Sequence, residues 1–250
     1  MALPVNSTEV DWNAVKRVLA RIGEKSGDFL EGNILIGGAA AWFYRGLLEF
    51  SQDKDFSAPH FSEQENRVWI SKDIYFIGTR REEIAARLGI PTEGDPPAPR
   101  IDGIWIDSPN EGLFLTCERA LATALSSTLP DGTDFSVASP ILLHREKTEL
   151  LLRKNRPQDR LHLLTLERAS RLVLCRLMEA DPFTKASCRE LFRLLKEVQE
   201  ISPELLCHSS LHRRTLEAME RMRGRQVCKN VLHLLEKQIQ PLMAASSAEQ

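Results

Sequence analysis

The chain has little net charge, no clustered cysteines and no long apolar run. Its 250 residues carry a formal net charge of -2, so global basicity does not predict nucleic-acid binding by counterion release. Its five cysteines include no C-x-x-C pair, which disfavours zinc and predicts reduced, mostly buried thiols. The start of the chain lacks a secretory pattern, and no run reaches the roughly 20 apolar residues of a membrane-spanning helix. We therefore expect a cytoplasmic protein with no membrane partner.

The pattern of apolar residues divides the chain into two parts. Residues 1–155 alternate strand and helix patterns, whereas residues 156–250 contain amphipathic helix patterns and no strand pattern. Strands are predicted at residues 33–37, 68–77, 101–107 and 135–139. Helices are predicted at residues 11–26 and 39–48, from capping boxes at Thr79 and Ser108, and from Pro140, with a linker at 91–99. The sequence thus predicts an α/β domain followed by an all-helical C-terminal domain.

Two glycines directly follow the first predicted strand. The buried run Ile34-Leu35-Ile36 precedes Gly37 and Gly38, and a helix pattern begins at Ala39. At such a junction the backbone can approach a phosphate closely, and the helix offers free N–H groups. The same pattern also occurs in tight turns that hold no ligand, so both interpretations stay open. The dinucleotide motif G-x-G-x-x-G is absent, which disfavours a dinucleotide site.

Carboxylates stand at the ends of two predicted strands. Asp73 precedes the apolar run 74–77, and Asp107 ends the strand at 101–107, with Asp102 as its alternative. Phosphoryl transfer with two magnesium ions uses three converging carboxylates. Because side chains two residues apart share one face of a strand, a further ligand is expected where the chain has Tyr75. A phenol with an ordinary pKa of about 10 is a poor magnesium ligand at neutral pH. The alternative is that Asp73 is a loop carboxylate without a ligand.

Three stretches, in order, resemble the nucleotidyltransferase superfamily, and most of all its minimal bacterial branch with the toxin-type enzymes of abortive-infection systems. They are Gly37-Gly38-Ala39-Ala40, then Ser71-Lys72-Asp73-Ile74-Tyr75-Phe76, then a run from Val137 through Lys147 to Arg156-Pro157-Gln158-Asp159. The family's second stretch is Thr-Lys-Asp-Ile-Asp-Phe, so Tyr75 replaces its second aspartate. Gln158 replaces a lysine, and His162 stands where a further aspartate often follows.

The resemblance implies a nucleotidyltransferase-like mixed sheet flanked by helices. It also implies transfer of a nucleoside monophosphate from a nucleoside triphosphate to a protein or nucleic-acid hydroxyl. Asp73 and Asp107 would hold Mg²⁺, and the nucleotide would contact Gly37, Gly38, Lys72, Lys147 and Arg156. The replacement at Tyr75 supports a second hypothesis, a catalytically degenerate binding or assembly module. Such a module would bind a partner protein or a second copy of the chain through its C-terminal helices.

Three sets of charged residues can also be explained without a ligand. Asp53-Lys54-Asp55 lies in the polar stretch 49–67 and is predicted to be a solvated loop. Lys147 and Arg156 would otherwise lie on the wet face of an amphipathic helix. The basic run from Arg213 to Lys229 is compatible with an RNA backbone, but its acidic neighbours favour an ordinary salt-bridged surface.

Overall fold

One mixed sheet organises the N-terminal part of the protein. The computed structural model describes residues 12–51, 53–65, 73–93, 98–109 and 115–248. Within these ranges the strands are β1 (Ile34–Ile36), β2 (Asp73–Ile77), β3 (Thr92–Glu93), β4 (Ala98–Ile101), β5 (Ile104–Asp107), β6 (Leu125–Thr128) and β7 (Asp134–Val137). Their order across the sheet is β3-β4-β5-β2-β1-β7-β6. The pairs β1–β7 and β2–β5 are parallel and the other neighbouring pairs are antiparallel, so the sheet is mixed.

Helices flank this sheet and form the whole of the C-terminal part. Those described are α1 (Trp12–Lys25), α2 (Gly27–Gly32), α3 (Gly37–Glu49), α5 (Arg81–Leu88), α6 (Cys117–Thr123), α7 (Pro140–Lys154), α8 (Pro157–Met178), α9 (Lys185–Ile201), α10 (Ser209–Met222), α11 (Lys229–Leu234) and α12 (Gln240–Ala248). Short 3-10 turns η1 (Pro203–Leu206) and η2 (Gln226–Cys228) and a π-helical turn η3 (Leu235–Ile239) connect the last ones. The predicted α/β class with a helical C-terminal region is confirmed.

The apolar pattern explains the central elements. Every residue of β1 is buried, as expected of a strand with a neighbour on each side and helices over the sheet. The inner face of α1 buries Val15, Val18, Leu19 and Ile22, which recur at helical spacing. The predicted helix at residues 11–26 is therefore confirmed over the residues that the structure describes.

Short sequence motifs predicted the ends of several helices and strands incorrectly. The capping box expected at Thr79 is wrong, because α5 begins at Arg81 and the Thr79 hydroxyl instead accepts hydrogen bonds from Asn33 and Arg87. The helix expected from Pro109 is also wrong, since Ser108 and Pro109 are not helical and α6 begins later. The expected linker 91–99 contributes β3 and the start of β4. Residues 68–72 of the second predicted strand lie outside the described residues.

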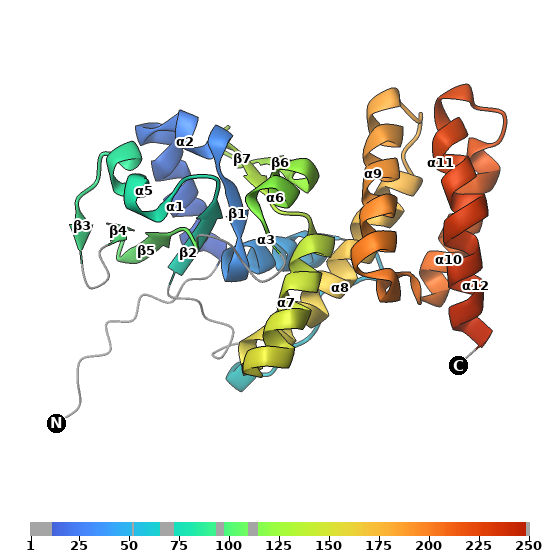
Figure 1. The fold of residues 1–250 in the computed structure, drawn as a ribbon, viewed down its shortest axis with the longest axis horizontal. Coiled ribbons are helices and arrows are strands. Elements are labelled where there is room, and N and C mark those ends of the chain that lie inside the picture. The colour runs from blue at the N-terminus through green and yellow to red at the C-terminus, as the bar shows by residue number, and fades with distance from the viewer. Residues whose placement is uncertain (1–11, 52, 66–72, 94–97, 110–114, 249–250) are drawn as a thin grey trace.

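The two parts of the chain share one core. In Figure 1 the sheet lies on the left, α9 to α12 stand on the right, and α7 and α8 lie between them. One continuous cluster of buried apolar side chains extends from Ala14 in α1 to Met243 in α12. The 22-residue helix α8 packs against α3, α7, α9 and α10, so it joins the helical part to the sheet. Among the described helices, none combines the length and apolarity needed to cross a membrane.

Candidate functional site

The structure brings four of the predicted site residues together where β1 runs into α3. Tyr75 lies beside Ile36 on the antiparallel neighbour β1 and beside Asp107 on the parallel neighbour β5. Asp73 is two residues before Tyr75 and therefore shares its face of β2. Gly37 and Gly38 follow Ile36 and open α3. We call Gly37, Asp73, Tyr75, Arg81 and Asp107 the turn cluster.

Tyr75 interacts directly with the carboxylate that the resemblance assigns to a metal. Its hydroxyl donates a hydrogen bond to Oδ2 of Asp73 at 2.9 Å. Burial raises the pKa of Tyr75 well above its ordinary value, and the negative charge of Asp73 raises it further. The phenol therefore stays protonated at neutral pH, and Tyr75 acts as a neutral donor to Asp73 rather than as an anionic ligand.

Asp107 is also occupied by protein groups. Its Oδ1 lies 2.8 Å from Nε of Arg81, in the first turn of α5, and accepts the Ser108 backbone N–H at 2.8 Å. The Asp107 side chain is 16% exposed and that of Arg81 is 39% exposed, so the pair is open to solvent on one side. Asp102, the alternative carboxylate, lies in the β4–β5 turn at the opposite end of β5, where it forms an ion pair with Arg21.

The geometry of Gly37 gives two reasons for a glycine at that position. Its φ is 70°, in the left-handed region that side chains disfavour. A Cβ added there would also lie 3.3 Å from Cδ2 of Tyr75, which is tighter than an ordinary contact. Gly38 is buried in the first turn of α3, and no side chain caps this helix end by a hydrogen bond. The positive end of a 13-residue helix is thus presented at the turn.

The donors present do not fit the two-metal site that the resemblance implies. No group of three or more His, Cys, Asp or Glu side chains is placed to hold a metal ion within the part of the chain that the structure describes. Asp73 accepts a hydrogen bond from Tyr75, and Asp107 is paired with Arg81. A divalent ion would have to displace both partners while gaining only two carboxylates.

Lys147 and Arg156, the basic residues that the resemblance assigns to the nucleotide, converge on Asp159 of α8. Lys147 Nζ lies 2.7 Å from Oδ1 of Asp159, and Arg156 Nε lies 2.8 Å from Oδ2. Burial raises the pKa of Asp159, but the charges and hydrogen bonds of Lys147 and Arg156 outweigh it and lower that pKa overall. Lys147 is 7% exposed, so a place on a wet helix face is wrong for this residue. Lys72 lies outside the described residues.

We call Lys147, Arg156, Asp159 and His162 the Asp159 cluster. Nδ1 of His162 lies 4.0 Å from Oδ1 of Asp159. A small apolar cluster connects α8 to α3, because Ala41 of α3 packs with Phe61 and with Leu161 of α8. Ala41 is one helical turn beyond Gly37, and Leu161 is two residues beyond Asp159. The Asp159 cluster itself joins α8 to α7, because Lys147 belongs to α7.

The prediction of a solvated loop around Asp53 and Asp55 is wrong. Arg214 of α10 donates to Oδ1 of Asp53 at 3.0 Å and to Oδ2 of Asp55 at 2.9 Å. Phe56 is 1% exposed and lies under the Arg214 guanidinium, 5.4 Å from ring centroid to Cζ. The loop is thus docked on the helical part of the protein. The aromatic residue Phe56, directly after the two acidic residues, was the sequence signal for this packing, and the polar composition of the stretch obscured it.

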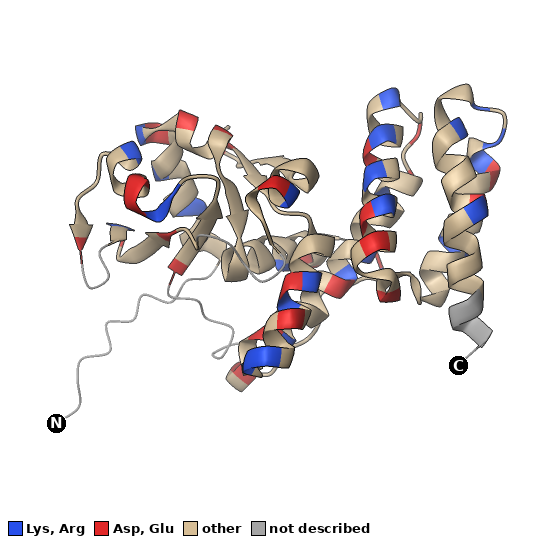
Figure 2. Ribbon diagram, in the orientation of Figure 1, with Lys and Arg blue, Asp and Glu red and all other residues tan. Residues whose placement is uncertain are grey.

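Other basic residues of the C-terminal run also have internal partners. Arg221 donates to the Met178 carbonyl oxygen at 2.7 Å, and Arg223 pairs with Glu220. Figure 2 shows Lys and Arg interspersed with Asp and Glu along the helices, rather than gathered by sign. The structure therefore agrees with the salt-bridged surface that the acidic neighbours favoured.

No protein-family model matches the chain, and neither the curated proteins nor the solved structures searched include a match to it. The resemblance to nucleotidyltransferases consequently rests on the three sequence stretches alone. What the turn cluster can do follows from the contacts of its own residues.

Proposed function

We propose that the chain is a nucleotidyltransferase-like binding module that holds the phosphates of a nucleoside triphosphate at the β1–α3 turn without metal-dependent transfer. The observation that carries the proposal is the hydrogen bond from the Tyr75 hydroxyl to Asp73, 2.9 Å long. In a transferase of the resembled family this position belongs to a second metal-binding aspartate. Here a neutral phenol fills it, so Asp73 has a permanent internal donor.

Two features support phosphate binding at the turn. The N-terminus of α3 lacks a side-chain hydrogen bond, so its N–H groups and positive dipole end favour an anion. Arg81 forms an ion pair with Asp107 through Nε, which makes no hydrogen bond to a described residue, and its guanidinium fork has further N–H donors. The same arginine offsets the charge of Asp107, which would otherwise repel a phosphate.

The C-terminal helices are the proposed surface for a partner protein or a second copy of the chain. Leu216 of α10, Val227 of η2 and Leu242 of α12 expose 41%, 41% and 38% of their surface. Burial of such side chains in an interface would be favourable at about 25 cal/mol per Å² of apolar surface. Nucleotide binding at the turn would then affect binding of the partner through the core that both parts share.

A second candidate function is metal-dependent nucleotidyl transfer to a protein or RNA hydroxyl. The specific observation in its favour is that Asp73 and Asp107 share one face of neighbouring parallel strands. The two candidates differ in what happens to a triphosphate labelled in its α-phosphate. A transferase moves the label to an acceptor, whereas a binding module leaves the triphosphate intact.

Calorimetric titration with each nucleoside triphosphate, in a chelator, tests the first proposal. Wild-type protein should bind at least one of them, and Arg81→Gln should weaken that binding by about tenfold, or about 1.4 kcal/mol. Arg80→Gln is the matched control, because Arg80 is exposed and its side chain makes no hydrogen bond that caps α5. Absence of binding by all four triphosphates, or equal effects of the two substitutions, would contradict the proposal.

A further inference from the structure

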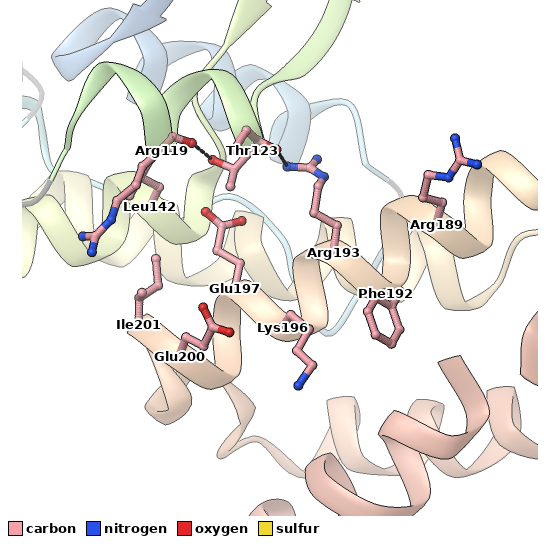
Figure 3. A pocket seen from close by; sticks show the side chains of 11 residues that line it. Arg119, Thr123, Leu142, Arg189, Phe192, Arg193, Lys196, Glu197, Glu200 and Ile201 are labelled. Carbon is pink, nitrogen blue, oxygen red and sulfur yellow. Dashed lines mark hydrogen bonds between the residues drawn. The ribbon is translucent and has the colours of Figure 1, made fainter. Parts of the chain in front are cut away.

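A groove lies between α6 and α9, away from the turn cluster. Its volume is about 520 Å³, within the range of sites that hold small organic ligands. Figure 3 shows α9 running beneath α6, with side chains of both helices and Leu142 of α7 around the opening. Apolar side chains such as Leu142 and Ile201 form part of the wall.

The groove is predominantly cationic. Four basic side chains line it, against two glutamates: Arg119, Arg189, Arg193 and Lys196. Arg193 donates to the Ala122 carbonyl oxygen at 3.0 Å, and Lys196 donates to Gln238 at 3.2 Å, so both are held in place. Arg189 is exposed and has no hydrogen bond or ion pair with any described residue. An anion with more than one negative charge suits this row of cations.

Glu197 adds an unsatisfied acceptor to the same groove. Its side chain lies between α9 and α6 in Figure 3, and the residue is only 7% exposed. Oε2 accepts a hydrogen bond from Ser139 Oγ at 2.9 Å, whereas Oε1 has no hydrogen-bond partner among the described residues. The Thr123 hydroxyl lies near enough to Glu197 to lower its pKa, but it donates at 2.9 Å to the Arg119 carbonyl oxygen. A buried acceptor without a donor is costly, so a ligand N–H or O–H is favoured there.

The spacing of these groups sets the size of the ligand. Arg189 and Glu197 are eight residues apart on α9, which corresponds to about 12 Å along the helix axis. Arg193 lies midway between them, one turn from each. A ligand that reaches both ends must therefore be about as long as a mononucleotide.

We propose that the α6–α9 groove binds an organic phosphate of mononucleotide size. Its phosphate pairs with Arg189 and Arg193, and a hydroxyl or amino donor at its other end meets Oε1 of Glu197. The body of the ligand lies along α9 between these two ends, and Ile201 stands one turn beyond Glu197. This site is separate from the β1–α3 turn and does not depend on the function proposed for that turn.

The test is a calorimetric titration of the full chain with adenosine 5′-monophosphate, and separately with inorganic phosphate. Both are performed in the Arg81→Gln background, in which binding at the β1–α3 turn is weakened. The monophosphate should bind saturably and at least about tenfold more tightly than inorganic phosphate, because only the monophosphate carries a distant donor. Failure of the monophosphate to bind, or equal affinities of the two probes, would overturn the proposal.

Two substitutions locate the site. Glu197→Met and Arg189→Ala should each weaken binding of the monophosphate by about tenfold. Lys185→Ala is the matched control, because Lys185 is an exposed cation one turn before Arg189 on α9 and does not line the groove. Since Arg189 is exposed, its removal should leave folding intact even if Glu197→Met disturbs packing. Loss of affinity in Lys185→Ala equal to that in Arg189→Ala would overturn the proposal.

Discussion

The turn cluster and the Asp159 cluster both contain groups that the family resemblance assigns to metal or nucleotide binding, but the two differ in burial. Asp159 is fully buried and has a cation within 2.8 Å of each carboxylate oxygen. Asp107 is 16% exposed, and its one cation partner is an arginine that is itself 39% exposed. A buried and paired carboxylate contributes to the folded state, whereas a partly exposed one can exchange its partner for a ligand. Substitutions should therefore affect stability in the Asp159 cluster and binding in the turn cluster.

The largest effect is expected from Asp159→Ala. This substitution leaves the buried Lys147 without its carboxylate, which should lower the free energy of unfolding by about 3–5 kcal/mol. Urea unfolding followed by circular dichroism measures the change. The double substitution Lys147→Met with Asp159→Leu is the control, because removing both charges should cost less than removing Asp159 alone. An equal or larger loss in the double variant would show that the ion pair is not the source of the effect.

Arg214→Ala is expected to have the next largest effect. The arginine is 15% exposed and pairs with Asp53, 12% exposed, and with Asp55. Its loss should cost about 2–3 kcal/mol in the free energy of unfolding, since hydrogen bonds between charged groups are removed and Phe56 loses its cover. Arg213→Ala is the matched control, because Arg213 is 63% exposed and its pair with Asp55 should contribute little. Equal losses in the two variants would contradict the burial rule drawn from the two clusters.

Glu197 is a third case, a buried carboxylate that forms no ion pair with any described residue, and it predicts a pH dependence. Burial raises its pKa from 4.5 to about 7, against the lowering effects of the Ser139 hydrogen bond and Arg193. The folded state therefore binds a proton more readily than the unfolded state. The resulting stabilisation is complete below pH 4.5 and is lost as the pH rises through about 7.

Glu197→Gln removes this titration. When the pH rises from 5 to 8, wild type should lose about 1–2 kcal/mol more of its free energy of unfolding than the variant does. Urea unfolding at the two pH values measures the difference, and Glu217→Gln, at an exposed position on α10, serves as the control. Parallel pH dependences of Glu197→Gln and wild type would contradict the assignment.

The smallest effect on stability is expected from Tyr75→Phe. The hydroxyl is half-buried and forms one hydrogen bond, so its loss should cost about 1 kcal/mol or less. The ring that packs against Gly37 is retained in this variant. A thermal unfolding curve measures the change. A loss as large as that of Asp159→Ala would place the turn cluster among the structural groups and remove the contrast between the two clusters.

The sequence predicted the α/β class and the convergence at the turn because both depend on short-range patterns. The buried run before Gly37 and the apolar run after Asp73 identify neighbouring strands, and strand periodicity places Tyr75 on the face of Asp73. The partners of these groups were not predictable in the same way. Arg81, Asp159 and Arg214 reach their carboxylates through tertiary packing, which sequence spacing does not encode. The burial of Glu197 was likewise not predictable from the sequence, because it depends on packing against α6 and α7.

The central claim is that the Tyr75 hydroxyl replaces a metal ligand, so that nucleotide binding at the β1–α3 turn does not require Mg²⁺. The most direct measurement is titration of wild type and Tyr75→Asp with ATP, labelled in its α-phosphate, in Mg²⁺ and in a chelator. Wild-type affinity should agree within about threefold between the two conditions, whereas Tyr75→Asp, with two aspartates on one strand face, should bind more tightly in Mg²⁺. Wild-type binding that requires Mg²⁺, or transfer of the label from ATP, would contradict the account.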